Sequence, residues 1–581
     1  MNLNKKFLIN IHRISLFLVV CLLLPSCSKE APRSASNAFY YNESDGLNTL
    51  DPARIGARAP WWIGSQIFTG LVGLDDNLNT KPLIAKSWEV STDGLVWTFN
   101  LRSDVKFADD DCFQNKKGRK LTAADIKYSF ERICNPTSSS TGFWIFRGKV
   151  KGADEFYKGL EDKKIDSPKE VTGFEVVNDS VFKITLVVPF APFLSMLSIP
   201  YAYIVPIEAI EKYGQDFQKH PVGAGPFVLI SWKPDEILVL KKNSNYYEKD
   251  SQNNQLPYLD SVVVTFIKDS KTEFLEFSQG KFDMVSNLDP TLADVVFDKS
   301  GKNLSGEYMK YHLHLKPALS VEYYGFNLDE STIGGKGSLL ATNKYLRKAI
   351  NWGIDRKSII DYVLKGKAIE ANYGPIPPGT PGFAGVVGYM FDKERALKYL
   401  DSAGFPNGKG LPEFTLQIGQ NEKSASIAET IQDQLKKIGI KIKLVQVDFP
   451  QHREMILDGK LPFWRTSWIA DYPDAENFMA LFYSPNKAPQ GPNTTHYSNK
   501  TVDSLYKLAL NPNLKKEERM VYYARAERVL LDDAPWVFLY YSIIQRITQP
   551  NLSGYSVDAL DRLSLTRVKK VAQLDGINKV K

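Results

Sequence analysis

The chain has 581 residues, of which 43% are hydrophobic and 24% are charged, and its formal net charge is +7 at pH 7. This length is about four times that of a ~150-residue domain, so two or three lobes are expected rather than one small core. The composition excludes a disordered chain, a collagen-like chain and a polytopic membrane protein, and is typical of a soluble globular protein.

The first 26 residues have the pattern of an export signal. Three basic residues precede a largely apolar run of eleven residues from Ile14 to Leu24, which is too short to span a bilayer. The sequence that follows, Leu24-Pro25-Ser26-Cys27, resembles a bacterial lipobox. We therefore predict a lipoprotein signal peptide at 1–26 and a lipid anchor at Cys27, the alternative being an ordinary signal peptide.

The net charge gives no support for a nucleic-acid partner. Three of the seven excess positive charges lie within residues 1–26, which leaves +4 on the mature chain. The densest basic run, from Lys116 to Lys120, contains a glycine and indicates a solvated turn rather than a phosphate-binding surface. We expect no nucleic-acid binding.

The remaining cysteines predict a disulfide. Cys21 belongs to the signal and Cys27 to the lipid anchor, which leaves Cys112 and Cys134. An even remainder in an exported protein favours a bridge between them, and closing this loop would contribute roughly 3 kcal/mol. Two free buried thiols are the alternative.

The mature chain begins with a polar stretch and continues with short strands and helices. Residues 27–38 are small, polar and proline-containing, as in a flexible tether. The Asp93-Gly94 turn between two apolar stretches predicts a β-hairpin over 88–101. Thr122 followed by Asp125 has the capping-box pattern, so we expect a helix to begin there.

The second half of the sequence alternates helices and strands more regularly. The pattern predicts helices over 424–438 and 515–531 and strands over 440–445, 463–469 and 537–542. This alternation favours an α/β lobe, whereas the hairpin-rich first part favours α+β. Two differently built lobes imply a cleft, and small ligands usually bind in such clefts.

Short segments between residues 40 and 550 carry a family resemblance. They are, in chain order, Asn48–Pro52, Pro82–Val90, Trp97–Arg102, Leu121–Asp125, Tyr128–Arg132, Val222–Phe227, Gly325–Asn327, Leu346–Ile350 and Ala396–Leu400. This ordered series resembles the extracellular solute-binding protein family 5, the peptide-binding components of ABC importers.

The resemblance implies an α/β, two-lobed fold like that of periplasmic binding proteins, in the class with an extra subdomain. A hinge of two segments, near Ala318–Tyr323 and Tyr540–Ile543, would join the lobes. The implied boundaries are 39–80, 200–318 and 543–581 for lobe I, 81–199 for its extra subdomain, and 319–542 for lobe II.

The segment from Trp464 to Asp474 carries the predicted ligand contacts. It resembles the oligopeptide-binding members, in which an aspartate after Trp-x-Ala pairs with the α-ammonium of the peptide and an arginine six residues earlier reaches its α-carboxylate. Those positions are Asp471 and Arg465. The other expected contacts are Ser467, Trp468, Ala470, Tyr324 and Tyr541.

Each of these residues has a structural alternative. An aspartate beside Tyr-Pro is often a turn former. Arg465 could pair with Asp471 or Asp474 inside one lobe. Trp468 and the two tyrosines could belong to the core.

The implied function is a substrate-binding lipoprotein that captures short peptides between its lobes and delivers them to ABC permease subunits. No catalytic motif is found, and we expect no enzyme activity, cofactor or bound metal, although His312 and His314 share a strand face. The protein is expected to be an exported monomer, anchored in the cell membrane or outer membrane and facing the periplasm or the extracellular side. Alternatives are another solute, such as an oligosaccharide, a nickel chelate or a haem, and, in other classes, a secreted hydrolase or a peptide chaperone.

Overall fold

The computed structural model describes residues 37–44, 46–163, 166–286, 288 and 290–571. The predicted signal peptide, Cys27 and nearly all of the 27–38 tether lie outside these residues, as does the end of the third lobe I segment. Among the described residues, no helix combines the length and the apolar character that crossing a bilayer would require.

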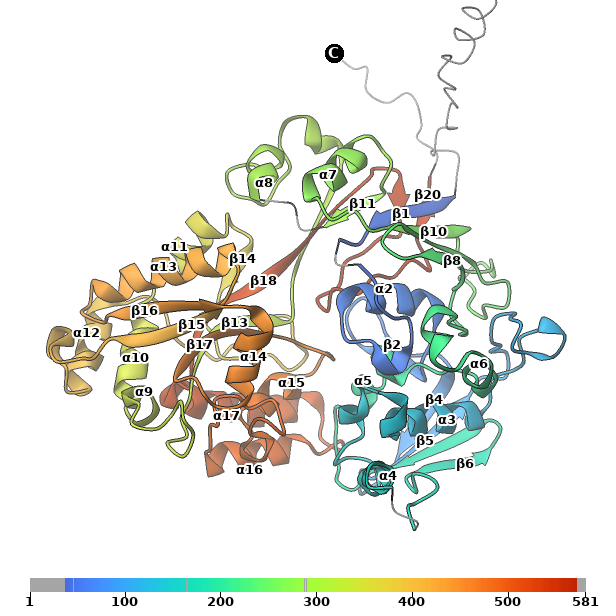
Figure 1. The fold of residues 1–581 in the computed structure, drawn as a ribbon, viewed down its shortest axis with the longest axis horizontal. Coiled ribbons are helices and arrows are strands. Elements are labelled where there is room, and N and C mark those ends of the chain that lie inside the picture. The colour runs from blue at the N-terminus through green and yellow to red at the C-terminus, as the bar shows by residue number, and fades with distance from the viewer. Residues whose placement is uncertain (1–36, 45, 164–165, 287, 289, 572–581) are drawn as a thin grey trace, which may run out of the picture. The chain divides into compact units, whose positions relative to one another are not determined.

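Two large hydrophobic cores, given by the burial of side chains, account for most of the described interior, and Figure 1 shows the ribbon of the elements that surround them. The first core is drawn almost entirely from residues 39–266 and 552–568. The second core is drawn mainly from residues 319–541. A third, smaller cluster collects apolar side chains from residues 274–311 and Ile547. The protein therefore has two lobes, and the first is built from segments far apart in the sequence.

A four-stranded sheet forms the base of the first lobe, in the order β1-β10-β9-β8. β1 runs parallel to β10, and the other pairs are antiparallel. Helix α2 packs against β8. The elements of this base are β1 (Ala38–Asn42), α2 (Arg58–Ile67), β2 (Val72–Leu74), β3 (Thr80–Pro82), α6 (Ile207–Tyr213), β8 (Phe227–Lys233), β9 (Ile237–Lys242), β10 (Ser261–Thr265), β19 (Leu552–Ser553) and β20 (Lys569–Lys570).

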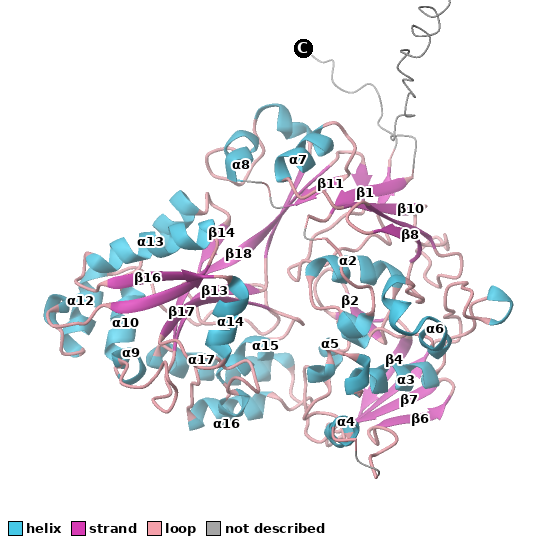
Figure 2. Cartoon of the chain, viewed as in Figure 1, coloured by secondary structure: helices cyan, strands magenta, loops and turns pink. Residues whose placement is uncertain are grey.

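A second, antiparallel sheet in the order β4-β5-β7-β6 lies within the predicted extra subdomain (Figure 2). The predicted hairpin is confirmed, since β4 pairs with β5 and Gly94 in its turn has φ of 74°. The capping box of Thr122 and Asp125 is also confirmed. The elements are β4 (Ala85–Val90), β5 (Val96–Leu101), α3 (Ala123–Cys134), α4 (Ala153–Glu161), β6 (Phe174–Asn178), β7 (Val181–Thr185) and α5 (Phe193–Met196).

The predicted disulfide is wrong, because Cys112 and Cys134 are both free thiols. Cys112 lies close to Glu208, which is tied through Arg119 to Asp125 in the first turn of α3. Cys134 is the last residue of that helix and is fully buried. Cys134 is part of the first core, whereas Cys112 only packs against its margin, so the fold does not bring the two sulfur atoms into the ~2 Å contact of a bridge.

The second lobe is a mixed sheet covered by helices, in the order β11-β18-β13-β17-β15-β16. β15 runs parallel to β16 and β17, whereas β13 is antiparallel to β17 and β18. Its elements are β13 (Ser320–Phe326), α9 (Leu339–Thr342), α10 (Lys344–Trp352), α11 (Arg356–Ser358), β14 (Ala368–Glu370), α12 (Lys393–Ser402), β15 (Phe414–Gly419), α13 (Glu422–Lys436), β16 (Ile442–Val447), α14 (Phe449–Leu457), β17 (Phe463–Ile469), α15 (Glu476–Met479), α16 (Lys500–Ala509), α17 (Lys516–Asp533) and β18 (Trp536–Thr548).

The elements predicted for this lobe are confirmed in kind. Strand β17 has the predicted bounds, and the two predicted helices correspond to α13 and α17, each within two residues at both ends. The last strand is much longer than the predicted 537–542, because it continues out of the second core.

Two neighbouring chain segments connect the lobes. β18 pairs with β13 through residues 536–540 and with β12 (His312–Pro317) through residues 543–548. Between β12 and β13, the Ala318 N–H donates to the Ser542 carbonyl at 2.9 Å. β18 and the β12–β13 segment therefore run side by side from one lobe to the other. The hinge predicted near 318–323 and 540–543 falls on this ribbon, and its role as a hinge stays a prediction. The same end of β18 also meets β11 (Met284–Ser286), next to α7 (Ser270–Ser278) and α8 (Pro290–Val296).

A glycine near the end of β13 is required by a large neighbouring side chain. Gly325 is paired with Trp464 on β17, and the indole lies over the glycine. A Cβ atom at Gly325 would be 2.9 Å from the Trp464 ring. The fully buried indole cannot move away, because Ile456 and Leu461 pack around it.

We expect Gly325→Ala to lower the free energy of unfolding by about 1–3 kcal/mol, the usual cost of overpacking a core. Urea unfolding followed by tryptophan fluorescence measures the loss. Gly419→Ala is the matched control on β15, because its new Cβ would meet Phe449 at an ordinary 3.4 Å. Equal stability of the two variants would contradict the packing argument.

Candidate ligand-binding site

The site begins where the parallel strands of the second lobe end. β15, β16 and β17 all terminate at the same edge of the sheet, at Gly419, Val447 and Ile469. In open α/β sheets, ligands bind outside this carboxyl edge. Residues 470–474 continue from β17 directly into this region, so the predicted Asp471 stands at the edge where a ligand is expected.

The Asp471 carboxylate is partly buried and has no cationic partner among the ion pairs of the described residues. Burial raises the pKa of Asp471 to about 6; a hydrogen bond with Asn477 opposes the rise and the nearby Glu476 carboxylate adds to it. Tyr201 of the first lobe lies near enough for the Asp471 charge to raise the pKa of its phenol, in addition to the effect of burial. Asp471 therefore faces the other lobe as a carboxylate whose charge is not neutralised.

Asp474, three residues later, is in the opposite situation. Its two carboxylate oxygens accept from the two terminal nitrogens of Arg519, each at 2.8 Å. The pair is buried, with side-chain exposures of 12% and 11%. Asp474 is thus a structural residue that fixes α17 against the 470–474 segment, which leaves Asp471 as the available acid.

A second buried acid stands beside Asp471. Glu476 is 3% exposed and accepts hydrogen bonds from the hydroxyls of Tyr472 and Tyr506. Burial raises the pKa of Glu476, and both hydrogen bonds and the more distant Lys149 lower it. Sequence reasoning missed Glu476, because its burial depends on the fold of the loop around it.

Arg465 is held by a partner that the sequence did not reveal. Its guanidinium pairs with Glu322 on the adjacent strand β13, rather than with Asp471 or Asp474. Burial lowers and the Glu322 carboxylate raises the pKa of Arg465, and the net shift is upward. The side chain remains 22% exposed, so part of the guanidinium faces solvent.

The residues between Arg465 and Asp471 take different roles. The Trp468 indole donates to Asn477 Oδ1 at 2.8 Å and packs on the second core. Ser467 is partly exposed, and Ala470 is buried with its N–H donating to the Leu319 carbonyl at 2.8 Å. Ile469 was not predicted as a contact, yet it is 64% exposed at the end of the strand.

The two tyrosines predicted to touch the ligand lie in the core instead. Tyr324 and Tyr541 both have 0% exposure. Tyr324 packs edge-on against Phe463, and the Tyr541 hydroxyl donates to the Gly374 carbonyl at 2.7 Å. Both strands carry their tyrosines inward, so neither side chain presents an atom to the edge where the ligand is expected.

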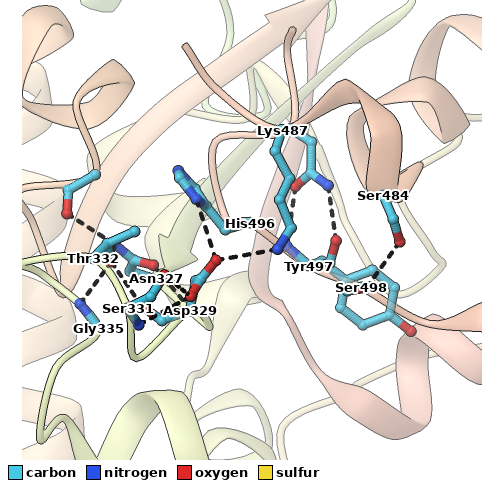
Figure 3. A network of polar contacts seen from close by, with 12 residues as sticks. Asn327, Asp329, Ser331, Thr332, Gly335, Ser484, Lys487, His496, Tyr497 and Ser498 are labelled. Carbon is cyan, nitrogen blue, oxygen red and sulfur yellow. Dashed lines mark hydrogen bonds and ion pairs between the residues drawn. The ribbon is translucent and has the colours of Figure 1, made fainter. Parts of the chain in front are cut away.

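Two cavities of the described residues lie away from this edge. One, of about 390 Å³, is lined by Leu328, Asp329, Glu330, Arg347, Lys487, His496, Tyr497, Ser498 and Asp533. Figure 3 shows Asp329 there between Lys487, at 3.1 Å, and His496. The other, of about 510 Å³, is lined by Lys302, Asn303, Leu304, Met309, Tyr311, Leu313 and Leu315. Neither cavity is lined by a residue of the 463–477 segment. The candidate site is therefore identified from the charge and exposure of its side chains rather than from a cavity.

Nothing in the described part of the chain groups three or more His, Cys, Asp or Glu side chains in an arrangement for a metal ion. His314 on β12 has its Nε2 atom 3.0 Å from the Thr548 hydroxyl and its ring against Tyr555. The shared strand face of His312 and His314 is thus partly engaged by neighbouring side chains.

Comparisons with known proteins agree with this architecture. The family profile "Bacterial extracellular solute-binding proteins, family 5 Middle" matches residues 79–490. The glutathione-binding protein GsiB of Salmonella typhi is 27% identical over 545 residues, which cover 92% of this chain and 95% of that protein. Heme-binding protein A of Haemophilus influenzae is 27% identical over 569 residues, covering 95% and 97%. The periplasmic oligopeptide-binding protein OppAIV of Borrelia burgdorferi has a similar structure, with a TM-score of 0.70, 26% identity, and 92% and 100% of the two chains covered.

The unneutralised Asp471 predicts an unusual pH dependence of stability. Since its pKa in the folded protein lies above the ~3.9 of an unfolded chain, the folded state binds this proton more tightly. Ionisation therefore costs stability progressively between about pH 4 and pH 6, and fully above pH 6. We expect Asp471→Asn to stabilise the ligand-free protein at pH 7 by about 1–3 kcal/mol and to leave it unchanged below pH 4.

Urea unfolding at a series of pH values from about pH 3 to pH 8 measures this difference. The control is Asp474→Asn, which breaks the pair with Arg519 and should destabilise the protein by about 3–5 kcal/mol. If Asp471→Asn destabilises the protein at pH 7 in the same way, Asp471 has a partner and the interpretation fails.

Proposed function

The chain belongs to the bacterial extracellular solute-binding proteins of family 5, and we propose that it is the lipid-anchored receptor of an ABC importer that captures short peptides. It would bind a peptide between its lobes, perform no chemistry on it and deliver it to the permease subunits. Cys27, outside the described residues, would hold the lipid, and the folded part would face the periplasm or the extracellular side.

The observation that carries this proposal is the uncompensated carboxylate of Asp471. A buried charge without a partner costs several kcal/mol, so a site of this kind selects a ligand that brings a cation. The α-ammonium of a peptide supplies one positive charge with three hydrogen-bond donors. The ligand would thereby supply the ion-pair partner that Asp471 lacks within the protein.

The other end of the ligand would meet Arg465. Its guanidinium is partly exposed and has donors beyond those used by Glu322. The chain from Arg465 to Asp471 spans at most ~20 Å when extended, which is ample for the two ends of a di- or tripeptide. A zwitterion placed this way would have both termini neutralised.

The edge of β17 offers hydrogen bonds to the ligand backbone. On one side, residues 466–469 pair with β13. On the other side, β17 pairs with β15 at Trp464 and Gln417, and residues 466–469 have no β15 partner within the described chain. An extended peptide could therefore add to β17 beyond Trp464 by β-augmentation, which reads backbone rather than side-chain identity. The exposed Ile469 would lie beside such a ligand as an apolar contact.

Two relatives are named for glutathione and for haem, and these are the alternatives to a short peptide as the ligand of this protein. Glutathione is a tripeptide with an ammonium group and two carboxylates, and it fits the charge arrangement proposed for the site. Haem has no ammonium group to pair with Asp471. Mass spectrometry of the ligand that co-purifies with the protein distinguishes peptides, glutathione and haem directly, and an unmodified peptide would also exclude a hydrolase.

We expect N-terminal acetylation to reveal the role of Asp471. In calorimetric titrations, wild type should lose 2–5 kcal/mol of binding free energy (about 30-fold to several thousand-fold in Kd) when tri-alanine is replaced by its N-acetylated form. Asp471→Asn should bind the free peptide weakly and show little further loss on acetylation. A loss on acetylation that is equally large in wild type and variant would remove Asp471 from the ammonium site.

We expect C-terminal amidation to test Arg465 independently. The amidated peptide should bind wild type at least about tenfold more weakly, because a charge-assisted hydrogen bond is lost. The double variant Arg465→Gln/Glu322→Gln leaves neither charge unpaired, and it should bind free and amidated peptides alike. Undiminished discrimination by the double variant would assign the carboxylate to another residue.

A further inference from the structure

The lobes also touch each other far along the sequence from the ribbon that connects them. The loop between α16 and α17 in the second lobe meets two loops of the sheet β4-β5-β7-β6. The Ala191 N–H donates to the Leu510 carbonyl at 2.8 Å. The Asn513 side-chain amide donates to the Thr92 carbonyl at 2.7 Å. Because both acceptors are backbone carbonyls, these contacts fix the position of one loop against another.

The backbones approach closely at this point because one of them is a glycine. Gly94, in the β4–β5 turn, has φ of 74°, and a Cβ atom there would lie 2.5 Å from Cγ of Pro512. Leu510 packs against both the first and the second core. The hydrogen bonds are therefore accompanied by apolar contact.

Tyr472 makes a second connection between the lobes. It directly follows Asp471 in the second lobe, yet its side chain is 4% exposed and belongs to the first core. Its hydroxyl donates back to Glu476 in α15. Tyr472 thus joins the apolar interior of one lobe to a buried acid of the other.

An opposite charge on the first lobe faces that acid. The Lys149 ammonium donates to the Trp144 carbonyl at 3.1 Å, and it has no carboxylate within ion-pair distance among the described residues. Burial lowers the pKa of Lys149, and Glu476 and Asp154 raise it. Glu476 in turn forms no ion pair with a cation in the described part of the chain. The partly buried Lys149 and the buried Glu476 therefore attract one another across the lobes without forming a contact pair.

We propose that these groups form an interlobe clasp, in which the extra sheet of the first lobe holds the second lobe closed. The clasp comprises Thr92, Gly94, Lys149 and Ala191 on one side and Tyr472, Glu476, Leu510 and Asn513 on the other. The lobes are connected covalently only through β12–β13 and β18, so contacts made elsewhere control how readily the cleft opens. This gives the extra subdomain a function in retaining the ligand, whatever the ligand is.

Hydrogen exchange of single amides tests the clasp directly. The Ala191 amide is protected by the Leu510 carbonyl alone, so its exchange reports separation of the lobes. We expect Asn513→Ala/Lys149→Met to raise this rate by at least about tenfold, which corresponds to about 1.4 kcal/mol. The radius of gyration in X-ray scattering should increase, and a bound peptide should dissociate faster by a similar factor.

The matched control is Lys151→Met, which removes an exposed ammonium two residues from Lys149. The Gly173 amide donates to the Lys151 carbonyl at 2.8 Å between two turns beside the sheet β4-β5-β7-β6, and it should keep its protection in every variant. If Gly173 also exchanges faster, the fold is disturbed, and Asn513→Ala alone, a change at an exposed side chain, decides the question. Unchanged Ala191 exchange and scattering in correctly folded variants would overturn the proposal. Failure of all peptides to bind would refute the proposed function but would leave the exchange experiment fully interpretable.

Discussion

The structure depends on one constraint, which is that a single strand belongs to both lobes. β18 contributes its first half to the second core and its last residues to pairs with β12 and β11. Any movement of one lobe relative to the other must therefore bend a hydrogen-bonded ribbon rather than a free linker. Between β12 and β13, Ala318 still donates to β18, but Leu319 donates to the Ala559 carbonyl of a third segment instead. The hydrogen-bonded ladder with β18 is therefore interrupted at this point. If the predicted hinge is correct, bending would be concentrated in these few residues.

Not all of the charged side chains at the carboxyl edge of the second sheet are paired with an opposite charge of the protein. Asp474 with Arg519 and Arg465 with Glu322 are pairs in which each charge is compensated by the protein. Within the described ranges, Asp471 and Glu476 have no cation in ion-pair contact, and Lys149 has no acid in ion-pair contact. The region therefore carries one more negative than positive group among the described residues, and the ammonium end of a peptide ligand would give Asp471 the cation that it lacks. If Asp471 binds the ligand as proposed, the stability that this charge costs the empty protein would be regained as binding energy.

Sequence reasoning recovered the parts of the molecule that depend on local pattern. The hairpin with its Asp-Gly turn, the capping box of α3, the alternation in the second half and the position of Asp471 after β17 all follow from residues close together in the chain. Sequence reasoning failed where a residue's partner or its burial depends on the register between neighbouring strands. The partner of Arg465 follows from which residue of β13 lies across β17, and the burial of Tyr324 and Tyr541 follows from which face each strand turns inward. The predicted disulfide failed for a related reason, because an even number of cysteines does not say whether the fold brings two thiols together.

The divided origin of the first core limits the order in which this protein can be completed. The second core comes almost wholly from one continuous stretch, whereas the first unites residues 39–266 with Leu552, Leu563, Leu565 and Val568 near the other end. During synthesis or secretion from the N-terminus, the first lobe emerges earliest and yet lacks part of its interior until almost the whole chain has followed. Its exposed apolar surface must stay soluble throughout that interval, which makes the lobe that begins first the one that is finished last.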